Sequence, residues 1–124
     1  MKSIFVSSTF KDMQRERDIL GAKVIPFINE EARKCGDEVN VCDLRWGINT
    51  LSESEEQSNI KILSTCLGEI DNCRPFMIVF LGNRYGWIPS EKLMKYTVQN
   101  TSRLELESYD LSVTALEIEY GAFF

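Results

Sequence analysis

Side chains that suit contacts with phosphates, a sugar or a flat ring gather in three short segments, each at the end of a strand-like run. The candidates in these segments are Ser7, Ser8, Thr9 and Phe10, then Asp43, Arg45 and Trp46, then Asn83, Arg84 and Tyr85. Each type also has a structural role: hydroxyls cap helices, tryptophans fill cores and arginines pair with aspartates. Arg45 has Asp43 or Asp12 within reach as a partner, and Arg84 has Asp110. Both interpretations stay open for every residue taken alone.

Glu117 is the candidate catalytic residue. It stands about one turn into a helix predicted to begin near Ser112, so it can face a cleft while Glu119 points away. The chain has no histidine, which excludes Ser-His-Asp and Cys-His catalysts. A carboxylate alone still suits cleavage of an N-glycosidic bond, because it can stabilise or capture the oxocarbenium-like sugar carbon, and a nicotinamide leaving group needs no general acid. The alternative is that Glu117 only compensates the helix dipole.

No cofactor or metal motif is present in the sequence. Neither G-x-G-x-x-G nor G-x-x-x-x-G-K-[ST] occurs, so dehydrogenase-like and P-loop nucleotide binding are excluded. Cys35, Cys42, Cys66 and Cys73 form two pairs with six residues between members, a spacing that matches neither redox nor zinc motifs. We therefore expect reduced thiols and no metal site. A metal-dependent nuclease is disfavoured because no clustered carboxylates stand out by spacing.

The elements that must position these residues alternate between strand and helix. Apolar runs predict strands at 2–7, 39–45 and 76–81, and the unbroken apolarity of 76–81 predicts burial on both faces. Helical spacing predicts helices over 12–34, from 52 to 73, near 90–96 and from 112 to 124. Pro26 should kink or divide the first helix, Gly36 should end it, and Pro75 should end the second.

The order β-α-β-α-β predicts an α/β fold with a parallel sheet and helices on both faces. We expect the strand order 2-1-3. In such a sheet, ligands bind beyond the carboxyl ends of the strands where the order reverses. All the candidate segments named above fall at that edge.

Length and charge narrow the class of protein. The chain has 124 residues, which suits one domain spanning 1–124, and a net charge of −5, which argues against nucleic acid as a partner. No apolar run is long enough to cross a membrane, and no signal peptide precedes the first strand, so we expect a cytoplasmic protein.

Three strands make a thin sheet for such long helices. We therefore expect the chain to be an N-terminal domain excised from a larger protein.

Five ordered blocks of sequence resemble one known family. They are Ile4–Asp18 (IFVSSTFKDMQRERD), Asp43–Ile48 (DLRWGI), Cys66–Phe76 (CLGEIDNCRPF), Leu81–Pro89 (LGNRYGWIP) and Ser112–Gly121 (SVTALEIEYG). The chain is identified by them as similar to the TIR-like domain of unknown function at the N-terminus of NACHT/STAND-type NTPases, often with TPR or WD40 repeats. This resemblance implies a flavodoxin-like three-layer fold related to TIR domains and nucleoside deoxyribosyltransferases.

The resemblance also implies roles for particular residues. Thr114-x-x-Glu117-Ile-x-Tyr120-Gly121 resembles the deoxyribosyltransferase motif T-x-x-E-[IL]-G-Y-A, in which the glutamate attacks or stabilises the ribose carbon. Glu119 stands where that motif has glycine, and Val113 where a glycine usually precedes the threonine. The segment from Ser7 to Phe10 falls where those enzymes place their substrate loop.

The expected function is therefore that of an effector domain that hydrolyses NAD or a related nucleotide when the NTPase region oligomerises, in an innate-immune or anti-phage response. NAD would be the substrate, with no cofactor required. The partners implied are the NTPase and repeat domains of the parent chain and further copies of this domain. The alternative is a non-catalytic TIR-like interaction module, because fold alone does not decide function.

Overall fold

Three parallel strands form the centre of the molecule. The computed structural model describes residues 2–9, 13–43, 55–101, 104–106 and 108–123. The strands are β1 (Lys2–Ser7), β2 (Val39–Cys42) and β3 (Met77–Val79), in the order β2-β1-β3. Phe5 of β1 lies opposite Cys42 on one side and Met77 on the other. The predicted parallel sheet of order 2-1-3 is confirmed.

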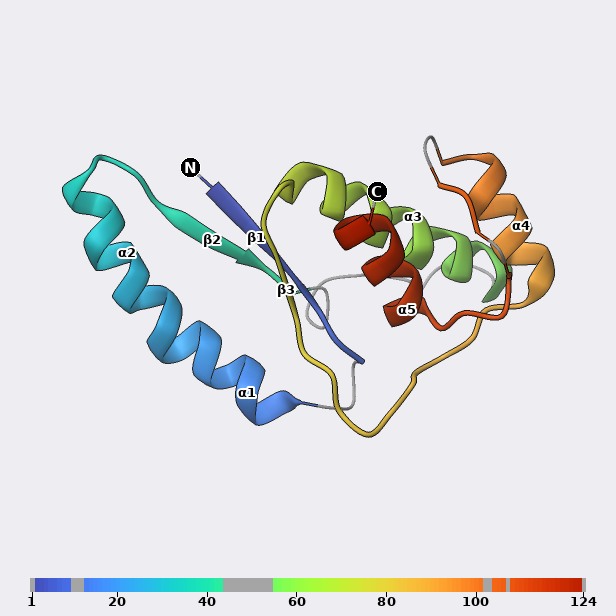
Figure 1. The fold of residues 1–124 in the computed structure, drawn as a ribbon, viewed down its shortest axis with the longest axis horizontal. Coiled ribbons are helices and arrows are strands. Elements are labelled where there is room, and N and C mark those ends of the chain that lie inside the picture. Colours follow the sequence, from blue (N-terminus) through green and yellow to red (C-terminus); the bar gives the residue numbers. More distant parts are fainter. Residues whose placement is uncertain (1, 10–12, 44–54, 102–103, 107, 124) are drawn as a thin grey trace.

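Helices cover both faces of this sheet because β1 alternates between two cores. Val6 points to a small cluster with Leu20 and Ile25 of the first helical segment. Phe5 points to a larger cluster built with the other helices, which includes Leu63. Figure 1 shows α1 and α2 on one side of the strands, with α3 and α5 on the other. The layers predicted from the β-α-β order are therefore present.

The first layer is one helical run divided in the middle. It consists of α1 (Gln14–Ile19), a π-helical turn η1 (Leu20–Val24) and α2 (Ile25–Lys34). Pro26 lies in the first turn of α2 and has no N–H to bond back to residue 22, so the helical ladder is interrupted there. Gly36, with a φ of 74°, ends the run as predicted.

The second layer contains the helices that carry the candidate site. Helix α3 (Glu55–Cys73) and the short α5 (Val113–Ile118) both contact β1, and α4 (Glu91–Gln99) packs on α3. Ser90 caps α4 and Ser112 caps α5, each by accepting a hydrogen bond from the amide three residues later. The chain continues from α5 into π-helical turns, η3 (Glu119–Phe123), which pack on α3.

The third strand is shorter and less buried than its sequence indicates. Met77 and Ile78 pack against opposite cores, yet every residue of β3 is only half-buried. Phe76 and Leu81 on either side are exposed. The reason is position: β3 is an edge of the sheet that the described residues form, so no described strand covers its outer side. Among the described residues, no helix combines the length and apolarity needed to cross a bilayer.

Candidate functional site

Glu117 lies inside the molecule beside the carboxyl end of β1. Its side chain is 6% exposed, and Oε1 accepts a hydrogen bond of 2.8 Å from the Ser7 hydroxyl. The Cys66 thiol of α3 lies close enough to the same carboxyl group for the two to influence each other's pKa. Glu117 therefore joins β1, α3 and α5, three elements far apart in sequence. The last helix thus places Glu117 against the end of β1.

The surroundings of Glu117 bring the pKa of its carboxyl group close to neutral pH. Burial raises the pKa of Glu117 to about 7. The hydrogen bond from Ser7, the neighbouring Cys66 thiol and the charge of Arg17 oppose that rise, and the charge of Asp43 adds to it. A buried carboxyl group poised near neutrality is common at catalytic sites. The same contacts raise the pKa of the Cys66 thiol, mainly through burial and then through the charge of Glu117.

A buried ion pair lies at the same end of the sheet. Arg17 holds Asp43 through two bonds, Nε to Oδ2 at 2.9 Å and Nη2 to Oδ1 at 2.7 Å. Its third bond, from Nη1, goes to the carbonyl of Thr9 at 2.8 Å. The side chains of Arg17 and Asp43 are only 1% and 10% exposed. Arg17 thereby fastens the segment after β1 to the end of β2.

The Oγ1 atom of Thr9 is buried and has no hydrogen-bond partner. It is the one buried side-chain oxygen or nitrogen in this state among the described residues. A buried hydroxyl in this state needs an explanation, and a ligand hydroxyl or a water can supply one. Gly86 packs against this residue: a Cβ there would lie 2.9 Å from Thr9 Cγ2 and 3.7 Å from Thr114 Oγ1. The neighbouring Ser8 is buried, and its hydroxyl donates to the Thr9 carbonyl at 3.3 Å.

The structure brings together part of the predicted set. Ser7 and Glu117 are in direct contact, and Thr9 and Asp43 meet through Arg17. Ser8 is buried beside Thr9. Asn83, Arg84 and Tyr85 are instead exposed, all in the segment that leads to Gly86. Three candidates lie outside the described residues: Phe10, Arg45 and Trp46.

Two site residues were missed by sequence reasoning. Arg17 is in phase with Met13 and Leu20 along the first helix, so an arginine on the apolar stripe was the available signal. Cys66 fits the apolar pattern of α3 as well as any core residue does. Only the tertiary contact with Glu117 identifies it.

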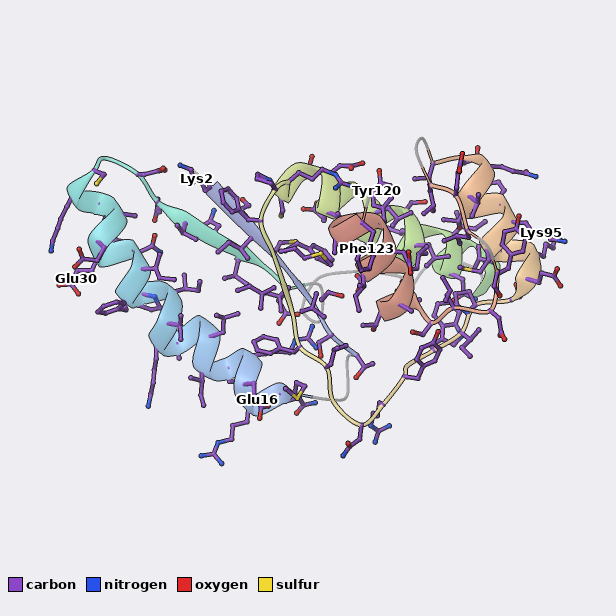
Figure 2. The ribbon with its side chains drawn as sticks, in the orientation of Figure 1. Lys2, Glu16, Glu30, Lys95, Tyr120 and Phe123 are labelled. Atoms are coloured by element: carbon purple, nitrogen blue, oxygen red, sulfur yellow. The ribbon has the colours of Figure 1, made fainter. Side chains whose placement is uncertain are left out.

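A separate cleft lies between α3, α4 and η3, with a volume of about 260 Å³. Asp71 and Tyr120 are among the residues that line it, and the Tyr120 hydroxyl donates to Asp71 at 2.8 Å. Arg74 stacks on the Tyr120 ring at 4.8 Å and also binds the Tyr120 carbonyl. Figure 2 labels Tyr120 on these C-terminal turns. The cleft is formed by a different set of side chains from those around Glu117.

Comparison with known proteins yields matches to large proteins. The profile of the family described as "Domain of unknown function (DUF4062)" matches residues 3–122. Telomerase protein component 1 of Mus musculus is 42% identical over 86 residues, 69% of this chain and 3% of that protein. A TPR repeat-containing protein of Dictyostelium discoideum is 42% identical over 89 residues, 72% of this chain and 5% of its own length. Tetratricopeptide repeat protein 41 of Rattus norvegicus is 30% identical over 90 residues, 66% of this chain and 7% of its own length. No solved structure matches.

Proposed function

This chain belongs to the DUF4062 family, whose members compared above are far longer proteins, and from that premise we propose that it is an effector domain that cleaves the N-glycosidic bond of NAD. Assembly of the NTPase and repeat regions of a parent protein would bring copies together and switch the activity on. The single observation that carries the proposal is the Glu117 carboxyl group held by Ser7 at the carboxyl end of the central strand.

The proposed reaction uses the carboxylate form of Glu117. The bond between the ribose C1′ and the nicotinamide nitrogen breaks, and its electron pair neutralises the pyridinium. Glu117 stabilises or captures the sugar carbon, and water then adds to it, giving ADP-ribose, nicotinamide and a proton. Because burial raises the pKa of Glu117 to about 7, the rate should increase as the pH rises through neutrality.

The remaining candidates have supporting roles in this proposal. The unpartnered Thr9 hydroxyl would bond a ribose hydroxyl, and Arg84 would contact phosphate. Glu117 is only 6% exposed, so the proposal requires a neighbouring segment to move before NAD can enter, and the segment that packs Gly86 against Thr9 and Thr114 is the candidate.

The test is to fuse the chain to a self-assembling carrier, supply NAD and follow nicotinamide release by chromatography. We expect Glu117→Gln to abolish release, while Glu105→Gln, which alters an exposed glutamate, retains it. Circular dichroism of both variants checks that the fold is kept. Nicotinamide release that is equal in the two variants would eliminate Glu117 as the catalytic residue.

A specific observation also favours a second function, self-association without catalysis. The segment after β3 exposes four large apolar side chains: Leu81 at 72%, Tyr85 at 52%, Trp87 at 44% and Ile88 at 45%. Several exposed apolar side chains within one short segment are typical of a contact surface, here for a second copy. Light scattering should show that Leu81→Asp weakens association. Phe27→Asp, on the opposite layer and 67% exposed, is the control that should not.

A further inference from the structure

Three side chains with metal-binding atoms meet between β2 and α3. Cys42 ends β2, and its side chain packs on the larger core, which places it on the α3 side of the sheet. Glu69 and Cys73 stand one turn apart on α3. The two sulfur atoms and a carboxylate oxygen all lie within 4.8 Å of one another. Cys42 Sγ is 3.5 Å from Glu69 Oε2.

We propose that Cys42, Glu69 and Cys73 bind a divalent cation of the zinc type. Thiolate sulfur with one carboxylate oxygen is a donor set that zinc accepts, at about 2.3 Å for sulfur and about 2.1 Å for oxygen. Tetrahedral angles then place sulfur and oxygen about 3.6 Å apart and the two sulfurs about 3.8 Å apart. The Cys42 thiol donates a hydrogen bond to Glu69 Oε2 at 3.5 Å, a separation close to the one that a shared zinc ion requires.

The location suits entry and retention of an ion. Cys42 and Glu69 are half-buried while Cys73 is buried, so the cluster has both a side open to solvent and a closed side. Cys42 and Cys73 are both free cysteines, so binding of the cation would displace their two thiol protons. A fourth position remains for water or another ligand.

Bound there, the ion would tie the edge strand β2 to α3. Both elements adjoin the candidate site, because Asp43 follows Cys42 directly and Cys66 lies two turns before Cys73 on α3. The metal proposal does not rest on NAD cleavage, since its ligands and its measurement are separate. Glu117→Gln should leave metal binding unchanged.

The test is a titration of the reduced, chelator-treated chain with Co²⁺, followed by competition with Zn²⁺. We expect one ion per chain, thiolate-to-cobalt charge-transfer absorption and its loss on adding Zn²⁺. Cys42→Ser, Cys73→Ser and Glu69→Gln should each weaken binding by roughly 100-fold or more, because even the loss of an outer-shell partner costs 10-fold to 100-fold. Cys35→Ser is the matched control, as Cys35 is exposed and outside the cluster.

Glu69→Gln keeps the size of the side chain, so it tests the site even if a cysteine variant fails to fold. Absence of the charge-transfer band in the reduced chain would overturn the proposal. So would equal affinity in Glu69→Gln, Cys42→Ser and Cys35→Ser. A Cys42–Cys73 disulfide found by peptide mapping, in a chain that takes up no Co²⁺ when reduced, would assign the two thiols to redox chemistry instead.

Discussion

At the scale of single residues, the burial of the Glu117 carboxyl group lowers stability when the group is ionised, and it also raises the pKa of a candidate catalytic group. Burying a carboxyl group disfavours its ionised form, and the hydrogen bond from Ser7 recovers only part of that free energy. If the side chain at this position only stabilised the fold, a neutral side chain would avoid this loss of free energy. That the chain has a carboxyl group at this position is what makes the residue worth testing.

The stability of the protein should reflect this cost. The pKa of Glu117 is about 7 in the folded chain against an ordinary value of 4.5, so the folded state holds its proton at a pH where the unfolded state has lost it. The stability contributed by the protonated group is fully present below pH 4.5 and is lost as the pH rises to about 7. The total is on the order of 3 kcal/mol.

Glu117→Gln should remove this dependence, because the amide resembles the protonated acid. Denaturant unfolding of the parent and the variant from pH 4 to 8 measures this dependence. Between pH 4.5 and about 7 the variant should become progressively more stable than the parent, and above that range the difference in the free energy of unfolding should stay constant. Glu105→Gln, at an exposed position, should follow the parent. A difference that does not vary with pH would contradict the protonation behaviour inferred for Glu117.

At the scale of elements, the site depends on a loop that packs closely over the start of α5. Gly86 has a φ of 96°, a conformation that favours glycine, and it approaches both Thr9 and Thr114. The Trp87 carbonyl accepts a hydrogen bond from the Val113 amide at 2.9 Å. The segment after β3 is therefore fastened to α5 at the point from which Glu117 enters the core.

Gly86→Ala should strain this contact in two ways. The backbone conformation is unfavourable for alanine, and the new Cβ would lie 2.9 Å from Thr9 Cγ2. We expect a loss of about 1–3 kcal/mol in the free energy of unfolding, measured by denaturant titration. Gly68→Ala is the control: Gly68 lies in α3 with nothing within 4 Å of a Cβ, so a gain of up to about 1 kcal/mol is expected. Equal stability of the parent and Gly86→Ala would show that the loop has no fixed packing.

At the scale of the whole molecule, the two faces of the sheet are unequal. The cluster on the α3 side contains ten buried residues, whereas the cluster under α1 and α2 contains three. Large apolar side chains on the α1–α2 layer stay exposed, among them Phe27 at 67%. The α3 side therefore contributes most of the hydrophobic free energy in the described part of the chain.

Hydrogen exchange should reveal this difference. Amides of α2 (Ile25–Lys34) should exchange at a lower opening free energy than those of α3 from Ile60 to Cys73, because local opening follows the density of buried contacts. Mass spectrometry of peptides under native conditions measures both. Equal protection of the two helices would indicate that the layers open as one unit.

Patterns along the chain predict the elements, their order and the parallel sheet. These follow from local periodicity and from the handedness of crossover connections, both of which are readable along the chain. The sequence also predicted that Glu117 and Ser7 lie at the same edge, since strand ends and helix starts converge there. Which atoms meet depends on how the elements pack in three dimensions. Arg17 pairs with Asp43, and the Ser7 hydroxyl binds Glu117.

The extent of burial was also decided in three dimensions. An apolar run does not reveal whether its strand is central or an edge, which is why β3 is only half-buried. The cysteines give the sharpest case: their spacing along the chain matches no metal motif, yet Cys42 and Cys73 meet around Glu69 because a strand end and a helix end are packed together. Spacing in sequence constrains only residues on one element, whereas a site built across elements depends on how those elements pack.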